Sequence, residues 1–118
     1  MRWATALSVS RSARFAAWRS KGLVVHSIAS LVIELEIADG ITLKDKRQVI
    51  RSLLDRLRGR FNVSAAEIGH LDSVRYATLA VVGVANEKRF LNEMMSKAAG
   101  LIESEPRVVV LDQELEFL

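Results

Sequence analysis

The sequence contains no cysteine, one proline and few aromatic residues, with four phenylalanines, two tryptophans and one tyrosine among 118 residues. The absence of cysteine excludes disulfides, thiolate catalysis and Cys-based zinc sites, and it fits a reducing compartment. No apolar run approaches the roughly 20 residues that cross a bilayer as a helix, so a soluble protein is expected. Half of the residues are hydrophobic, which is enough for the core of one domain of this length.

Acidic residues are missing from the first part of the chain. Residues 1–22 contain five basic residues and no acid, whereas residues 43–61 have a net charge of +5 and the remainder of the chain −7. From residue 23 onward the net charge is therefore −2, although the whole chain carries +3. The high isoelectric point does not by itself indicate nucleic-acid binding.

Residues 1–22 also differ in composition from everything that follows. They are rich in Arg and Ser and have no clean periodicity. This composition is compatible with an organellar transit peptide, a disordered basic tail, or translated upstream sequence before a true start near Leu23. The continuous apolar segment of a secretory signal is missing, so export is not expected. We assign residues 1–22 to a basic N-terminal extension and residues 23–118 to a single domain.

The most regular helix signal lies in residues 43–61. The side chains of Thr42 and Asp45 fit a capping box that begins the helix near Leu43. Gly59 is expected to end it by adopting the left-handed conformation of a C-terminal cap. Apolar residues at helical spacing predict one buried stripe, formed by Val49, Ile50, Leu53, Leu54 and Leu57.

The strands are predicted from shorter patterns in the sequence. Alternation of apolar and polar residues predicts strands at residues 30–37 and 108–117. Branched and apolar runs predict two more strands, at residues 61–68 and 76–85.

A second helix is expected after Asn86, which can cap it, and before Pro106, which stops it. Its predicted buried stripe consists of Phe90, Leu91, Met94, Met95, Ala98, Leu101 and Ile102. The order strand, helix, strand, strand, helix, strand predicts an α+β, ferredoxin-like plait (split βαβ, βαββαβ). In this plait two helices cover one face of a four-stranded antiparallel sheet, and the first and third strands are central.

The face of the sheet away from the helices is a candidate interaction face. Because the last strand pairs with the first, five carboxylates are expected on it, namely Glu34, Glu36, Asp112, Glu114 and Glu116. Val32, Val108 and Val110 are expected among these carboxylates. The face lacks the aromatics and the positive charge of an RNA-recognition motif. It is a candidate surface for a protein partner or for a second copy in a homodimer.

The basic residues of the first helix and of the strand after it are a candidate RNA- or ribosome-binding site. Lys44, Arg47, Arg51 and Arg58 fall within a sector of about 60° beside the apolar stripe. The full candidate set is Lys44, Lys46, Arg47, Arg51, Arg58, Arg60, Asn62 and Ser64. Contacts of this kind position a protein on RNA without reading its sequence. The alternative is a solvated helix face with i, i+4 pairs such as Arg51 with Asp55.

A family resemblance supports the same fold. The segment ITLKDKRQVIRSLLDRLRGRFNVSAAEIGHLD resembles the signature of the YlxP-like family, which comprises small bacterial proteins of unknown function. The matching residues are Leu43, Lys44, Lys46, Arg47, Arg60, Phe61, Asn62, Val63, Ser64, Ala66 and Glu67, and Thr42 replaces the usual serine. The resemblance covers residues 23–118 and departs from the pattern at Ser73, Val74 and Arg75. It implies a ferredoxin-like fold, a cytoplasmic bacterial setting and a gene neighbourhood among translation and ribosome-maturation factors.

No catalytic constellation is evident, so the protein is not expected to be an enzyme, and no cofactor, metal site or membrane partner is predicted. His70 and Asp72 could serve as a base and its orienter, but no nucleophile accompanies them. His26 stands without the partners that a metal ligand needs. Residues 38–43 occupy the loop that amino-acid-sensing plaits use for ligands, which leaves a small-ligand-sensing domain as a further alternative.

Overall fold

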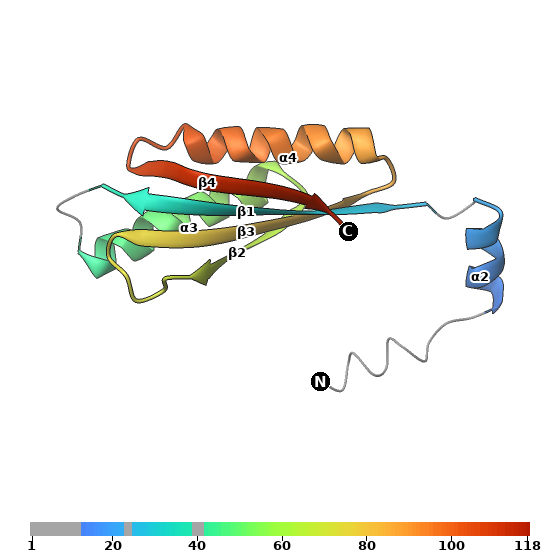
Figure 1. Cartoon of the computed structure of the whole chain (residues 1–118), viewed down its shortest axis with the longest axis horizontal. Coiled ribbons are helices and arrows are strands. Elements are labelled where there is room, and N and C mark those ends of the chain that lie inside the picture. Colours follow the sequence, from blue (N-terminus) through green and yellow to red (C-terminus); the bar gives the residue numbers. More distant parts are fainter. Residues whose placement is uncertain (1–12, 23–24, 39–41) are drawn as a thin grey trace.

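The computed structural model describes residues 13–22, 25–38 and 42–118. Its helices are α2 (Ala13–Ser20), α3 (Leu43–Arg60) and α4 (Lys88–Glu103). Its strands are β1 (Ser27–Ile37), β2 (Val63–Gly69), β3 (Tyr76–Ala85) and β4 (Val108–Phe117). From β1 onward the elements follow the order predicted from the sequence (Figure 1).

The four strands form one antiparallel sheet in the order β2-β3-β1-β4, so β1 and β3 are central as predicted. Every second side chain of β1 is buried, from Ala29 to Ile37, because α3 and α4 pack against that face. The opposite face of the sheet is not covered by a described helix (Figure 1). This arrangement confirms the ferredoxin-like plait.

The core lies between the helices and the sheet. From α3 it receives Val49, Ile50, Leu53 and Leu57, and from α4 it receives Leu91, Met94, Met95, Ala98, Leu101 and Ile102. Two of the residues assigned to these stripes deviate from the prediction. Leu54 is only partly buried, and Phe90 is 58% exposed although the next residue, Leu91, is fully buried.

The predicted ends of the helices need two corrections. The capping box of Thr42 and Asp45 is present, but α3 continues through Gly59 to Arg60, and its cap is the extended residue Phe61. Gly59 does not adopt a left-handed conformation, because Phe61 packs against the core and its N–H reaches the carbonyl of Leu57. Helix α4 is capped by Glu87 rather than Asn86, and no side-chain hydrogen bond closes that end.

A break in register between β1 and β4 changes the faces predicted for β4. Glu34 pairs with Asp112, whereas the next residue, Leu35, pairs with Val110, so β4 contains one extra residue at this point. Such a bulge interrupts the strict alternation of a strand. Val108 is therefore buried and Val110 packs against the core. Val108 and Val110 do not lie among the carboxylates, and the exposed residues here are Val109 and Leu111.

Within the N-terminal extension, the structure has α2 over eight residues. The described side chains of this helix are exposed, and it adds no strand to the sheet. Residues 1–12 lie outside the described part of the chain. None of the described helices is both long enough and apolar enough to cross a membrane.

Candidate functional site

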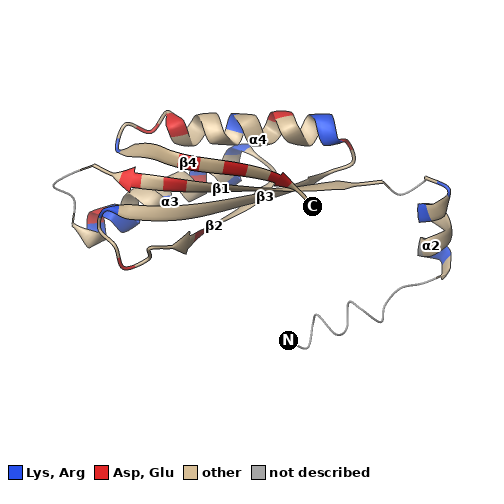
Figure 2. Cartoon of the chain, in the orientation of Figure 1, with Lys and Arg blue, Asp and Glu red and all other residues tan. Residues whose placement is uncertain are grey.

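The exposed side of α3 carries a row of four basic residues, which we call the basic stripe: Lys44, Arg47, Arg51 and Arg58. The row exists because the apolar residues of α3 occupy the opposite side of the helix. Its members span about 21 Å along the axis at the usual rise of a helix. Basic residues on α3 are blue in Figure 2, on the opposite side of the sheet layer from the open face.

The basic stripe is only weakly neutralised by carboxylates. The guanidinium of Arg47 lies 3.9 Å from the carboxylate of Asp72, which is fully exposed. Arg58 approaches Asp55 at 3.5 Å and donates a shorter hydrogen bond, of 2.6 Å, to the carbonyl of Ala65. The carboxylate of Asp55 thus pairs with Arg58 rather than with Arg51, the pair expected from the i, i+4 spacing. Exposed pairs at these distances contribute little and leave the positive charge available.

Lys46 must be removed from the predicted set of surface contacts. Its side chain is completely buried, and its ammonium donates to Glu67 at 2.7 Å and to the carbonyl of His70 at 2.8 Å. Lys46 lies three and four residues before Val49 and Ile50, so it belongs to the buried side of α3. Its charge is satisfied inside the protein and is not available to phosphate.

The remaining predicted contacts are not part of the basic stripe. Arg60 and Asn62 line a cleft of about 420 Å³ between the end of α3 and α4, together with Phe90 and Lys97. Ser64 pairs in register with Val82 and is exposed. The eight predicted residues are thus divided among the basic stripe, the interior, this cleft and β2.

The open face of the sheet has an acidic half, formed by β1 and β4. In the register of these strands Glu34 lies opposite Asp112, and Glu114 and Glu116 lie opposite Val32 and Ser30. This confirms that the five carboxylates share the β1–β4 half of the sheet, where they are red in Figure 2. Two of them already have partners, since Glu34 accepts a hydrogen bond from Thr78 at 3.0 Å and Glu36 pairs with Arg75 at 2.8 Å.

The other half of the open face, formed by β2 and β3, contains no charged residue. Its outward side chains are Ser64, Ala66, Ile68, Tyr76, Thr78, Ala80, Val82 and Val84. Ile68 and Val84 are each more than half exposed, and Val82 is 39% exposed. We call this surface the apolar half. The contrast between the halves was not predicted, because the sequence patterns were assigned to faces and not to pairs of strands.

A family model described as "Protein of unknown function (DUF503)" matches residues 28–115, which is most of the chain. The chain belongs to the DUF503 family. The match starts in β1 and ends in β4, so it includes both candidate surfaces and leaves α2 outside.

Two individual proteins resemble this DUF503 member. The uncharacterized protein YlxP of Bacillus subtilis (strain 168) is 29% identical over 75 residues, which cover 64% of this chain and 82% of YlxP. A crystal structure of a dimeric ferredoxin-like protein of unknown function from Thermobifida fusca YX aligns with 80% of this chain and 91% of its own. The TM-score of that alignment is 0.46, and the sequence identity is 14%.

In this DUF503 chain His70 and Asp72 are not arranged as a catalytic pair. His70 has a positive φ of 61°, and its carbonyl accepts the hydrogen bond from buried Lys46. Its ring lies 6.0 Å from the ring of Tyr76, whereas Asp72 faces Arg47. Among the described residues no three His, Asp or Glu side chains gather as metal ligands. Residues 39–41 of the loop considered for ligand sensing lie outside the described part.

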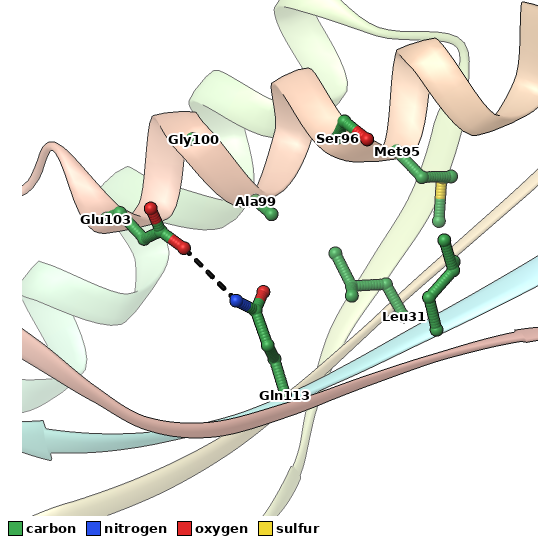
Figure 3. Close-up of a pocket in the computed structure, with 8 residues that line it drawn as sticks. Leu31, Met95, Ser96, Ala99, Gly100, Glu103 and Gln113 are labelled. Carbon is green, nitrogen blue, oxygen red and sulfur yellow. Dashed lines mark hydrogen bonds between the residues drawn. The ribbon is translucent and has the colours of Figure 1, made fainter.

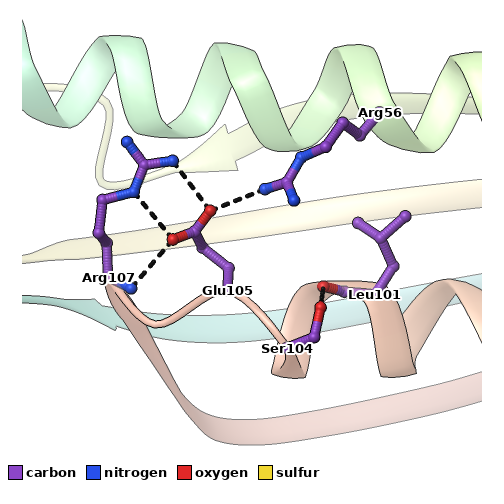
Figure 4. A network of polar contacts seen from close by, with 5 residues as sticks. All are labelled: Arg56, Leu101, Ser104, Glu105 and Arg107. Atoms are coloured by element: carbon purple, nitrogen blue, oxygen red, sulfur yellow. Dashed lines mark hydrogen bonds and ion pairs between the residues drawn. The ribbon is translucent and has the colours of Figure 1, made fainter.

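A polar cluster around Glu105 was not predicted from the sequence (Figure 4). The Glu105 carboxylate is buried, and it accepts hydrogen bonds from the Arg107 guanidinium at 2.8 and 2.9 Å and from Arg56 at 2.7 Å. The side-chain hydrogen bonds of Arg107, together with the smaller effect of Arg56, lower the pKa of Glu105 to about 2 against the opposing effect of burial. The same contact raises the pKa of Arg107. The cluster joins α3 to the connection between α4 and β4.

Two of the buried ionic groups differ in how far the sequence could reveal them. Lys46 could have been assigned to the interior from its spacing, because it continues the apolar periodicity of α3 toward the N-terminus. Glu105 carries no such signal, since it lies outside the periodic segments and its partner Arg56 is 49 residues away. From their positions, we infer that Lys46 and Glu105 both stabilise the fold.

Proposed function

We propose that this protein is a noncatalytic RNA-binding module that contacts RNA phosphates through the basic stripe of α3. The observation that carries the proposal is the exposure of Lys44, Arg47, Arg51 and Arg58 along one side of one helix, with only weak carboxylate contacts. A rigid helix holds these charges at fixed spacing, as binding to a regular phosphate backbone requires. Structured RNA, including ribosomal RNA, is the substrate class that fits this surface.

The mode of binding follows from the kind of side chains involved. Lysine and arginine side chains neutralise phosphates and release condensed counterions, so the affinity should fall steeply as salt rises. The basic stripe contains no aromatic residue, and it therefore offers no platform for stacking bases. The module should recognise the shape and charge of the RNA and should discriminate poorly between sequences.

The proposal is tested by titrating the full chain with a structured RNA and with purified ribosomal subunits at two salt concentrations. A variant with Lys44→Glu, Arg47→Glu and Arg51→Glu should lose most of the salt-dependent affinity. The matched control reverses three exposed basic residues of α4, namely Lys88→Glu, Arg89→Glu and Lys97→Glu. It changes the net charge by the same amount and should bind nearly as well as the natural protein. Equal loss of RNA affinity in both variants would show that binding depends on overall charge and not on the basic stripe. Absence of RNA binding by the natural protein would refute the proposal.

A second candidate function is self-association through the apolar half of the open face. It is favoured by the exposure of Ile68, Val82 and Val84 in a region without charged residues. Pairing of the complete faces about a two-fold axis is unfavourable, because it opposes carboxylates to carboxylates or to apolar side chains. Pairing of only the two apolar halves avoids this repulsion.

Sedimentation velocity over a range of protein concentrations tests self-association. A dimer that dissociates in a variant with Val82→Lys and Val84→Lys, but not in a variant with Val109→Lys, would support the apolar half as the interface. Val109 is a suitable control because it is also exposed on the open face but lies in the acidic half, on β4 opposite Glu36. A natural protein that stays monomeric at all concentrations would exclude this function.

A further inference from the structure

Strand β4 has a free edge. In the sheet of described strands it is the last one and pairs only with β1, so the N–H and C=O groups on its other side have no strand partner. Such an edge is a template for pairing with another strand. Gln113 to Phe117 follow the bulge in unbroken register with β1, which leaves a straight segment of edge.

A groove runs beside this edge, between β4 and α4 (Figure 3). Its volume is about 410 Å³, and its floor contains the core residues Leu31 and Met95. The wall formed by α4 consists of small residues, Ser96, Ala99 and Gly100, which leave room for side chains from outside. At one end the amide of Gln113 reaches across the groove and donates to Glu103 at 3.2 Å.

We propose that β4 and this groove bind an extended peptide segment of a partner protein, which adds to the sheet as a fifth strand. Edge strands recognise peptides in this way, since the main chain provides the hydrogen bonds and adjacent pockets accept alternate side chains. In an added strand every second side chain would lie on the helix side, next to Gln113 and Leu115, and enter the groove. Those side chains are apolar, because Leu31, Met95 and Ala99 line the groove.

The charge of β4 selects the other side chains of the partner. On the open face an added strand lies next to Asp112, Glu114 and Glu116, and all three are exposed. Lysine or arginine at these positions would form cross-strand pairs of opposite charge. The partner segment therefore alternates basic and apolar residues. This inference is independent of RNA binding, because the basic stripe and the free edge of β4 lie on different elements.

A second copy of this chain does not fit the same edge. Antiparallel pairing of two β4 strands about a two-fold axis brings residues 112, 114 and 116 of one copy opposite the same set in the other. Like charges directly opposite one another are destabilising. The edge of β4 is thus protected against self-pairing by the carboxylates that would attract a basic segment.

The test uses a synthetic peptide, acetyl-KVKVKVK-amide, titrated into the full chain labelled with ¹⁵N. We expect amide signals of β4 and α4 to shift and the outer amides of β4 to gain protection from hydrogen exchange. A peptide with glutamate in place of lysine should bind about tenfold more weakly or worse, because each favourable cross-strand pair becomes a repulsive one.

Substitution of a single glycine tests the groove. A Cβ at Gly100 would meet no atom within 4 Å, and Gly100 lines the groove, so the ring of Gly100→Phe is expected to occupy it. The matched control is Gly59→Phe in α3, where a Cβ likewise meets nothing within 4 Å. Binding of KVKVKVK should be lost in Gly100→Phe and kept in Gly59→Phe, with both variants folded by circular dichroism. Equal binding by the two variants, protection on β2 instead of β4, or no binding at millimolar peptide would overturn the proposal.

Discussion

Helices α3 and α4 cover the same face of the sheet, but they are attached to it by different interactions. All six buried residues of α4 are apolar, and its N-terminal end lacks a side-chain cap. The five buried residues of α3 include Lys46, and a capping box fixes its N-terminal end. Helix α3, which keeps much of its surface charged, therefore relies on a buried ion pair and a cap in addition to packing. Helix α4 relies mainly on packing.

The largest effect is expected for Lys46→Met. The substitution leaves Glu67 and the carbonyl of His70 without their donor, and removal of one partner from a buried pair destabilises proteins by about 3–5 kcal/mol. Urea unfolding measures this loss. The control Lys44→Met lies on the exposed side of the same helix and should change stability by less than about 0.5 kcal/mol. Similar midpoints for the two variants would show that the buried pair does not hold α3 in place.

The second effect concerns the cluster that joins α3 to the end of α4. The pKa of Glu105 is lowered from its usual value of 4.5 to about 2 in the folded protein. As the pH falls, Glu105 therefore binds a proton in the unfolded chain before it does so in the folded protein. Its stabilisation, of up to about 3 kcal/mol, is present above about pH 4.5 and is lost between pH 4.5 and pH 2. Unfolding measured over this range should show that Glu105→Gln is much less sensitive to acid than the natural protein. A Glu93→Gln variant, with its exposed carboxylate removed, should keep the natural acid sensitivity.

A smaller effect is expected where α4 approaches β3. A Cβ at Gly83 would lie 2.8 Å from the terminal carbon of Met94 and 3.1 Å from a methyl group of Leu91. The flexible end of Met94 can move, but Leu91 is fully buried, so Gly83→Ala should destabilise by about 1 kcal/mol through overpacking. Thermal unfolding checks this prediction. A variant that also carries Met94→Ala has room for the added methyl group, and the Gly83→Ala penalty should shrink in it.

The last two effects should have opposite signs at the two helix N-termini. Thr42→Ala removes the capping box of α3 and should cost about 1 kcal/mol, whereas Glu87→Ser offers α4 the side-chain cap that it lacks and should stabilise by a few tenths of a kcal/mol or more. Differential scanning calorimetry can resolve both changes. Destabilisation by Glu87→Ser would mean that the backbone at this position does not allow the serine to cap.

The sequence was sufficient to predict the plait, because two of its strands alternate with period two, the other two are branched or apolar runs, and its helices carry clear apolar stripes. Features that depend on other parts of the chain were predicted poorly. The bulge in β4 arises opposite Glu34 and Leu35, so the strand's own alternation gave Val108 and Val110 the wrong face. Gly59 was assigned as a helix end from residue type alone, although the packing of Phe61 decides where α3 ends.

The candidate site was predicted only in part, for a similar reason. The basic stripe was correctly placed on the exposed side of α3, because helical spacing alone determines the direction of Lys44, Arg47, Arg51 and Arg58. Charge by itself could not distinguish Lys46 from these exposed residues, although the same helical spacing directs Lys46 into the core. The edge position of β4 follows from the predicted strand order, whereas the groove beside it depends on the packing of α4, which no local pattern encodes.

The pair formed by Lys46 and Glu67 also constrains how this protein can change during evolution. Loss of the lysine alone leaves the Glu67 carboxylate, which is only 14% exposed, without its ion-pair partner. Loss of the glutamate alone leaves the Lys46 ammonium, which has no access to water, without its partner. Either intermediate is less stable than both the starting protein and a variant in which two apolar residues have replaced the pair. We therefore expect these two positions, 21 residues apart, to be substituted together in the DUF503 family, and such covariation would trace the contact between α3 and β2 without any structure.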